Sequence, residues 1–158
     1  DVSFRVEHGE SVAIVGANGA GKSTLLMHLN GTLAPATGKV IIGDLPLTSG
    51  TAREVRRTVG MVFANPDDQL FMPTVREDVA FGHLNLGLAT VDVEGRVAMS
   101  LEKVGAGHLA DRPPYRLSSG EKRLAAIATV AKNDLMVVPC LYRISILTWC
   151  RCESVAAL

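Results

Sequence analysis

The stretch GANGAGKS at residues 16–23 decides the fold of this chain. It matches the phosphate-binding loop pattern of a glycine, any four residues and then Gly-Lys-Ser. The apolar run at residues 11–15 predicts a buried strand before the loop, and residues 23–30 predict a helix after it. A strand that turns through glycines into a helix directs backbone N–H groups and the positive end of the helix dipole toward one anion. The stretch therefore predicts a polyphosphate site.

Two side chains of this loop have specific chemistry. Lys22 is expected to contact the β- and γ-phosphates of a nucleotide, and the Ser23 hydroxyl is expected to bind Mg²⁺ as the metal ligand. The expected ligands of the loop are thus a nucleotide polyphosphate and Mg²⁺. The predicted cofactor-binding residues of the loop are Gly16, Asn18, Gly19, Gly21, Lys22, Ser23 and Thr24.

Composition limits what the chain can be. Its 158 residues suit one domain with at most a small second lobe, and 47% hydrophobic with 20% charged residues is a globular composition. A formal net charge of zero gives no basic surface for nucleic acid, so no nucleic-acid partner is expected. The sequence contains no apolar run of membrane-spanning length and no secretory signal, which favours a soluble protein whose membrane role would need a partner. The chain also begins inside a strand pattern without methionine, so we expect it to be truncated at its N-terminus.

The remaining elements follow from local patterns. Val93, Val97, Leu101 and Val104 recur at helical spacing, and Ser118 with Glu121 has the spacing of a capping box before a helix. The apolar stripe of that last helix is predicted from Leu124, Ile127, Ala128 and Ala131. Further strands are predicted at 1–6, 39–42, 58–63 and 135–138, a short helix from Thr74 to Gly82, and an extended linker at 112–114.

Several other polar residues suggest sites, but simpler interpretations are preferred. His8, His28, His83 and His108 lie on different elements without ligand spacing, so solvated or capping roles are expected. Asp67 and Asp68 follow a proline, and we expect them to end a strand and solvate a loop rather than form a catalytic pair. The cysteines are Cys140, Cys150 and Cys152, which do not form a disulfide framework or a metal site by their spacing.

Two further stretches resemble one protein family. Leu117-Ser118-Ser119-Gly120-Glu121, here called the signature stretch, resembles the Leu-Ser-Gly-Gly-Gln signature of ABC-transporter ATPases. Residues 62–71 and 74–82, including Asn-Pro-Asp-Asp-Gln at 65–69, resemble the Q-loop region of the cobalt-type, or energy-coupling-factor, ATPases. The resemblance extends from Asp1 to about Val138 and depends on these motifs occurring in this order.

The resemblance implies an α/β fold of the P-loop NTPase (ABC ATPase) class. It has a parallel central sheet, an antiparallel β edge and a small helical subdomain, and it would be incomplete at both ends here. The implied domains are a nucleotide-binding core at 1–72, a helical subdomain at 73–117, the signature helix and return strand at 118–138, and an atypical tail at 139–158.

The resemblance also implies a function. Two ATPase subunits, identical or different, would pair head to tail, with each ATP between one phosphate-binding loop and the Ser118, Ser119 and Gly120 of the other. Together with transmembrane subunits they would form an importer for metal ions or vitamins, with the ATPase peripheral at the cytoplasmic face of the membrane. ATP binding and hydrolysis would drive transport, and the sequence does not identify the solute.

The chain departs from the family pattern at three places. Ala64 stands where the family has the Q-loop glutamine, while Ser119 and Glu121 replace a glycine and the glutamine of the signature. Pro139-Cys140 stands where the family has the Mg²⁺-ordering Asp and the general-base Glu, so no catalytic residue is identified. Loss of a general base typically costs about 10²–10⁴ in rate. The tail from 139 also contains no glycine, and we hypothesise that it is foreign to the ATPase sequence.

Three functions remain open from the sequence. The first is an ATPase component of an ABC importer, and the second is a nucleotide-binding fragment of such a subunit that does not hydrolyse ATP. The second is preferred for the isolated chain because the base is missing. The third, a P-loop small-molecule kinase, would need a second substrate site, and the signature stretch disfavours it.

Overall fold

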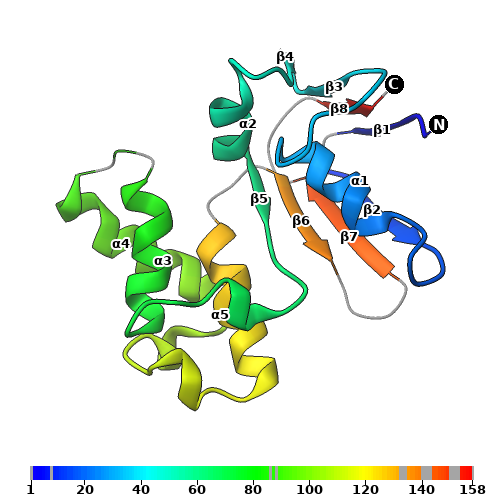
Figure 1. Cartoon of the computed structure of the whole chain (residues 1–158). Coiled ribbons are helices and arrows are strands. Elements are labelled where there is room, and N and C mark those ends of the chain that lie inside the picture. The colour runs from blue at the N-terminus through cyan, green and yellow to red at the C-terminus, as the bar shows by residue number, and fades with distance from the viewer. Residues whose placement is uncertain are drawn as a thin grey trace. The chain divides into compact units, whose positions relative to one another are not determined.

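The protein folds into two compact units (Figure 1), formed by Asp1–Ala64 with Asn133–Leu158 and by Asn65–Lys132. The predicted boundaries after residues 72 and 117 both fall inside the second unit. Within the part of the chain that the structure describes, no helix is long and apolar enough to cross a bilayer. The computed structural model describes residues 2–7, 9–85, 87, 89–131, 135–139, 144–149 and 154–157.

The strands of the first unit form two sheets. One has the strand order β1-β8-β3-β4 and the other the order β2-β7-β6-β5. The bounds are β1 (Phe4–Glu7), β2 (Ser11–Val15), β3 (Val40–Ile42), β4 (Leu45–Pro46), β5 (Val59–Met61), β6 (Leu135–Pro139), β7 (Ile144–Trp149) and β8 (Ser154–Ala157).

The sheet that contains β2 is mixed. β5 and β6 pair in parallel, with Val59 opposite Leu135, whereas β7 is antiparallel to both of its neighbours, β2 and β6. It follows that β2, β6 and β5 run in one direction and that β7 lies between β2 and β6 in the opposite direction (Figure 1). The predicted parallel arrangement of the central sheet is therefore interrupted by one antiparallel strand. The sequence of β7, ISILTW, is rich in β-branched and aromatic residues that favour strands.

The core of the first unit lies between its sheets and the helix after the loop. α1 (Lys22–Leu29) buries Leu26 and Leu29, which are at most 1% exposed. Val12 and Ile14 of β2 are half-buried and pack against the same cluster. The other buried members of the cluster are Val6, Val40, Ile42, Val55 and Val59.

Residues 11–15 form a strand, as predicted, but the strand is not buried as predicted. The residues of β2 alternate between exposed and half-buried, and Val15 is 67% exposed. A strand places successive side chains on opposite faces, so packing of Val12 and Ile14 leaves Ser11, Ala13 and Val15 on the other face. An apolar run alone therefore does not show that both faces are covered.

One helix has no counterpart among the predicted elements. α2 (Ala52–Thr58) precedes β5, and the strand predicted from residue 58 begins one residue later, at Val59. In α2 only Val55 is buried, because the helix sequence AREVRRT has a single large apolar residue. Helical periodicity in the sequence depends on several apolar residues on one face, and α2 offers no such stripe.

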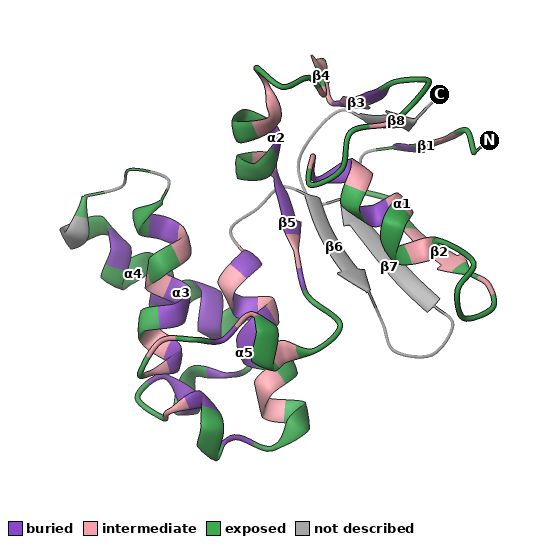
Figure 2. Ribbon diagram, in the orientation of Figure 1, coloured by how far each residue is buried: buried purple, intermediate pink, exposed green. Residues whose placement is uncertain are grey.

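The second unit is helical. In α4 the buried residues include Val93, Val97 and Leu101, which confirms the predicted apolar face (Figure 2). The segment after Arg112-Pro113 turns as a short 3₁₀ helix instead of staying extended. The elements are η1 (Pro66–Asp68), α3 (Val75–Leu84), α4 (Thr90–Lys103), η2 (Gly107–Leu109), η3 (Pro114–Arg116) and α5 (Ser119–Val130).

The apolar face of α5 agrees with the predicted stripe only in part. Ala128 is buried as predicted and, with Ala125, belongs to the core cluster of the second unit, whereas Leu124 is 37% exposed. Small residues on α5 let the helix approach its neighbours closely, so the contact face is set by alanines and not by the largest side chain. The cluster also contains Leu70, Val75, Val79, Val93, Val97, Leu101, Ala106, Leu109, Ala110 and Leu117.

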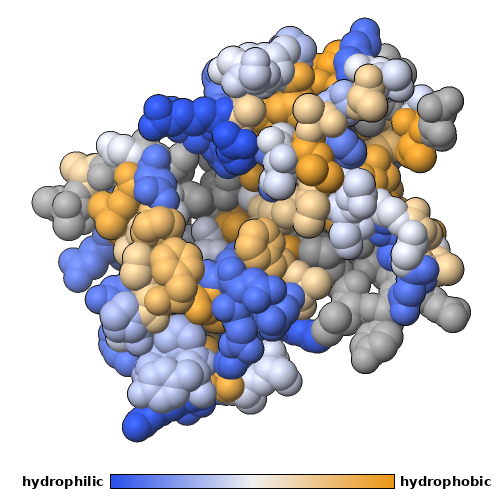
Figure 3. All heavy atoms as spheres, in the orientation of Figure 1, coloured by the Kyte–Doolittle hydropathy of each residue, from blue (hydrophilic) through white to orange (hydrophobic). Residues whose placement is uncertain are grey.

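Some large apolar side chains remain at the surface of the second unit. Phe71 is 63% exposed and Phe81 39% exposed, and their ring centroids are 5.1 Å apart in an edge-to-face arrangement. Figure 3 shows hydrophobic side chains at the surface interspersed with hydrophilic ones. The Phe71–Phe81 contact therefore covers only part of each ring.

A buried carboxylate holds the chain that leads into α3. Asp78 is only 4% exposed, and its Oδ1 accepts hydrogen bonds from the backbone N–H groups of Phe71 (3.0 Å) and Met72 (3.1 Å). Burial raises the pKa of Asp78, and the two backbone donors act in the opposite direction. The carboxylate sits in the first turn of α3, where the helix dipole favours a negative charge.

We expect Asp78→Ala to destabilise the chain by about 1–3 kcal/mol, because two backbone N–H groups lose their shared acceptor inside the unit. Urea unfolding followed by circular dichroism measures this change. Glu102→Ala on the exposed part of α4 is the matched control and should change the free energy of unfolding by less than about 0.5 kcal/mol. Equal effects of the two substitutions would contradict the role assigned to Asp78.

Candidate functional site

The loop between β2 and α1 has the backbone that an anion site needs. Gly19 and Gly21 have φ angles of 80° and 87°, in the left-handed region. A Cβ added at either glycine would meet nothing within 4 Å, so the backbone conformation, and not lack of space, requires glycine there. Gly21 is the N-cap of α1 and no side chain caps this helix end. The first N–H groups of a helix have no intrahelical acceptor, and within the described residues no side-chain cap takes their place at this helix end.

The Lys22 side chain folds over the same loop. Its Nζ donates to the backbone oxygens of Gly16 (2.9 Å) and Ala17 (2.8 Å). Lys22 is half-buried, whereas Ser23 and Thr24 are exposed, and the first turn of α1 contains no acidic residue. The structure thus brings the predicted loop residues, Gly16 to Thr24, together at one turn with a positive charge over it.

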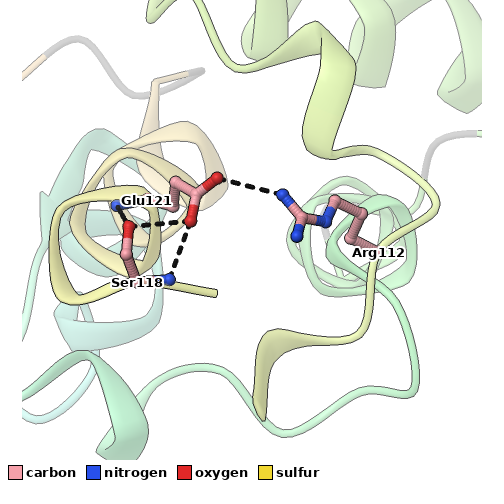
Figure 4. Close-up of polar contacts among 3 residues, drawn as sticks. All are labelled: Arg112, Ser118 and Glu121. Carbon is pink, nitrogen blue, oxygen red and sulfur yellow. Dashed lines mark hydrogen bonds and ion pairs between the residues drawn. The ribbon is translucent and has the colours of Figure 1, made fainter. Parts of the chain in front are cut away.

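The signature stretch begins α5 as a capping box, as predicted. Ser118 is the N-cap, and its Oγ accepts from the N–H of Glu121 at 3.4 Å. In return, Oε2 of Glu121 accepts from both the N–H and the hydroxyl of Ser118, each at 2.7 Å (Figure 4). Ser119 and Gly120 lie exposed in the first turn of the helix.

Glu121 is held as a carboxylate. The Ser118 hydroxyl and then the Ser118 N–H lower the pKa of Glu121, and Arg112, whose Nη1 lies 3.0 Å from Oε1, acts in the same direction. The donors of Ser118 are therefore already used by a negatively charged group of the same chain (Figure 4). Any second anion at this helix end would compete with that group for them.

The predicted cofactor residues are divided between the units. Gly16, Asn18, Gly19, Gly21, Lys22, Ser23 and Thr24 lie in the first unit, and Ser118, Ser119 and Gly120 lie in the second. Their joint use by a head-to-tail pair remains a prediction.

The region after β5 contains exposed aspartates and a glutamine whose bonding partners were not predicted. Asp67 accepts from Lys122 Nζ, and Asp68 accepts from Asn65 Nδ2, so neither only solvates a loop. Gln69 donates to Ala126 and Thr129 of α5. The sequence gives no signal for these partners of Asp67 and Gln69, because they lie 55 to 60 positions further along the chain.

Ala64 is exposed, and its methyl group cannot supply the amide of the Q-loop glutamine that the resemblance leads one to expect. Pro139 ends β6, while Cys140, Cys150 and Cys152 lie outside the described residues.

One histidine has a different role from the predicted one. His83 is 3% exposed, and its Nε2 lies 3.4 Å from the Ser100 Oγ, so it belongs to the interior and is neither solvated nor a cap. His28 Nδ1 lies 3.1 Å from the Leu33 oxygen, and His8 lies outside the described residues. In the described part of the chain, no group of three or more His, Cys, Asp and Glu residues is arranged to hold a metal ion.

Comparison with known proteins identifies the family. Residues 1–138 match the family described as ABC transporter. The chain belongs to the ABC transporter family. The match ends where the predicted resemblance ends, and residues 139–158 lie beyond it.

Two relatives indicate the branch of the ABC transporter family that the chain resembles. The ABC transporter sequence is 70% identical over 139 residues to an ABC transporter ATP-binding protein of Geobacter sulfurreducens, covering 87% of this chain and 56% of that protein. It is 54% identical over 141 residues to the energy-coupling factor transporter ATP-binding protein EcfA of Methanothermobacter thermautotrophicus, covering 87% of this chain and 45% of that protein.

A solved structure supports the same fold. The structure of cbiO1 from Clostridium perfringens, part of the ABC transporter complex cbiONQ, matches with a TM-score of 0.69 and 35% identity. The match covers 79% of this chain and 51% of that one, so the predicted P-loop NTPase fold class is confirmed. The chain spans about half the length of the relatives it matches.

Titration of Glu121 should make the contribution of the capping box to the free energy of unfolding depend on pH. Because its folded-state pKa is lowered, Glu121 stabilises the fold above its unfolded-state pKa, and this contribution is lost as the pH falls through the folded-state value. The free energy of unfolding of Glu121→Gln should therefore lie furthest below that of the unsubstituted protein at neutral pH. The two should converge in acid. Urea unfolding of both proteins between pH 7 and pH 3 (roughly the range in which an ordinary carboxyl titrates) measures the difference, and a difference that does not vary with pH would contradict the assignment.

Proposed function

We propose that this chain is the nucleotide-binding part of the ATP-binding component of an ABC importer of the cobalt or energy-coupling-factor type. The observation that carries the proposal is the loop at residues 16–21, where left-handed glycines, an uncapped helix end and Lys22 meet. The family and the names of the relatives support the transporter context.

The residues present fit ATP and Mg²⁺. The first-turn N–H groups of α1 and the Lys22 ammonium supply positive charge for a triphosphate, and the exposed Ser23 hydroxyl is available as a metal ligand. Lys22 now contacts two loop carbonyls, and we expect its ammonium to exchange them for phosphate oxygens when nucleotide binds. Bound Mg²⁺ would neutralise part of the phosphate charge.

The proposed partners are a second ATPase subunit and transmembrane subunits. The signature stretch at the start of α5 would face the phosphate-binding loop of the second subunit, so that ATP holds the pair together until hydrolysis. The protein would lie at the cytoplasmic face of the membrane as a peripheral component. Metal ions or vitamins are the proposed solutes, and the membrane components would determine which one is carried.

A second candidate function is nucleotide binding without turnover. Pro139-Cys140 occupies the positions at which the resemblance places the Mg²⁺-ordering Asp and the general-base Glu. The chain would then bind ATP and leave it intact, while the importer lineage stays the same.

The loop proposal predicts stabilisation by nucleotide. A ligand at a hundredfold excess over its Kd should raise the free energy of unfolding by about 2.7 kcal/mol, since it binds only the folded state. We expect Mg-ATP to produce such a shift and Lys22→Ala to remove most of it. Thermal unfolding with and without Mg-ATP tests this, with Lys39→Ala, an exposed lysine outside the loop, as the matched control. A shift that survives Lys22→Ala would place the nucleotide elsewhere.

The second candidate function predicts negligible turnover. Purified chain should then release phosphate from Mg-ATP no faster than Lys22→Ala does, because Pro139-Cys140 would leave the water without an activating carboxylate. A coupled phosphate-release assay measures this. Turnover that is abolished by Lys22→Ala would show that another residue acts as the base, and would favour the hydrolytic function.

A further inference from the structure

The second unit contains a contact between two segments that no part of the proposed nucleotide site uses. One segment is Asn65–Gln69, which includes η1, and the other is α5, which carries the signature stretch at its N-terminus. We propose that Asp67 and Gln69 are positioning residues that fix the signature helix to the segment following Ala64. This inference rests on the proposed function, because it assigns a role to the helix that presents Ser118.

The bonds lie on one face of α5. Asp67 Oδ1 accepts from Lys122 Nζ at 2.5 Å, and Gln69 Nε2 donates to the Ala126 oxygen at 3.0 Å and to Thr129 Oγ1 at 2.7 Å. Positions 122, 126 and 129 follow one another at helical spacing of four and three residues, so they form one stripe along about two turns. The segment thus contacts the helix at more than one level, which restricts rotation as well as translation.

The two sets of bonds differ in exposure to water. In the Asp67–Lys122 pair the lysine side chain is 19% exposed and the aspartate side chain 61% exposed. The Gln69 bonds are better shielded, because Gln69 and Thr129 are half-buried and Ala126 is buried. Hydrogen bonds in such surroundings hold their geometry better than exposed ion pairs, because water competes less for the donors and acceptors. The Arg76–Asp111 pair of the same unit is more exposed than the Asp67–Lys122 pair, with side chains that are 41% and 82% exposed.

The segment itself is stiff. The Asn65 side chain accepts from the N–H of Asp67 and donates to Asp68, Pro66 fixes the first backbone angle of η1, and the N–H of Gln69 bonds to the Pro66 oxygen. Because the segment Asn65–Gln69 is stiff and bonds to α5 at several positions, a change in the position of the segment would move α5 with it. α5 is a continuous helix from Ser119 to Val130, so the Ser118 end follows its bonded face.

The contact also joins the places where the chain enters and leaves the second unit. The chain enters at Asn65 and leaves after Lys132. Gln69 lies four positions after the entry and Thr129 three before the exit, and the Gln69–Thr129 hydrogen bond connects them. The two connections therefore cannot separate inside the second unit without breaking this bond.

Hydrogen exchange tests the contact without nucleotide. Gln69→Glu keeps the shape of the side chain but removes both donors, and Lys122→Met keeps the apolar stem but removes the charge. We expect amide exchange in α5 to rise by about tenfold in each variant, about the effect of one lost hydrogen bond, with exchange in α4 unchanged. The charge exchange Asp67→Lys with Lys122→Asp should return α5 to within about threefold of the unsubstituted chain.

Asp111→Asn is the matched control, because it removes an ion pair of the same unit that does not involve α5. It should leave exchange in α5 unchanged. Exchange in α5 that stays unchanged in both test variants would overturn the proposal, and so would an equal rise over α3, α4 and α5, which indicates general destabilisation. If Gln69→Glu does not fold, Lys122→Met and the charge exchange still decide the matter.

A second readout separates positioning from stability. In sedimentation experiments with Mg-ATP, Gln69→Glu should bind nucleotide with unchanged affinity but form the nucleotide-dependent pair about tenfold more weakly than the unsubstituted chain. Altered exchange with unaltered pairing would overturn the positioning role. If the unsubstituted chain binds no ATP, the proposed function fails, while the exchange data still decide whether the contact holds α5.

Discussion

The left-handed backbone at Gly19 and Gly21 is the constraint on which the nucleotide site depends. It lets β2 turn into α1 so that first-turn N–H groups and the Lys22 ammonium meet at one point. An L-residue with a side chain would be strained at both glycines although the space around them is open. The two ends of the loop are held by packing, since β2 contributes Val12 and Ile14 and α1 contributes Leu26 and Leu29 to one cluster. The core of the first unit therefore also fixes the shape of its anion site.

The N-termini of α1 and α5 differ in how their backbone N–H groups are capped. α1 begins at a glycine without a side-chain cap or an acidic first turn, whereas α5 begins with a complete capping box. Free N–H groups at α1 favour an external anion, and the Glu121 carboxylate supplies an internal one at α5. The N-terminus of α5 is thus capped within the chain. A phosphate group of a nucleotide on a second subunit would have to share the Ser118 donors with the Glu121 carboxylate, which pairs with Arg112. Glu121 stands where the family signature has glutamine. This replacement adds a negative charge, and its carboxylate competes with a phosphate for the hydrogen-bond donors of Ser118.

The parts that sequence predicted correctly are those that depend on neighbouring residues. The loop, the capping box and the buried face of Val93, Val97 and Leu101 each follow from a pattern within about a dozen positions. β7 between β2 and β6, and the roles of Asp78 and His83, depend instead on which segments meet in space. Residue type limits what a side chain can bond, but tertiary contacts select its partner.

The departure from the predicted stripe on α5 and the missed role of Gln69 have one physical cause. Of the predicted residues Leu124, Ile127, Ala128 and Ala131, only Ala128 is fully buried, and Ala125 and Ala126 are buried with it. A helix face of alanines lets a neighbouring segment approach the backbone, and only at such a distance can an amide from Gln69 reach the Ala126 oxygen. A larger side chain at 126 would hold the segment away and leave that donor without its acceptor. Close packing by small residues and hydrogen bonding to the helix backbone are therefore parts of the same contact.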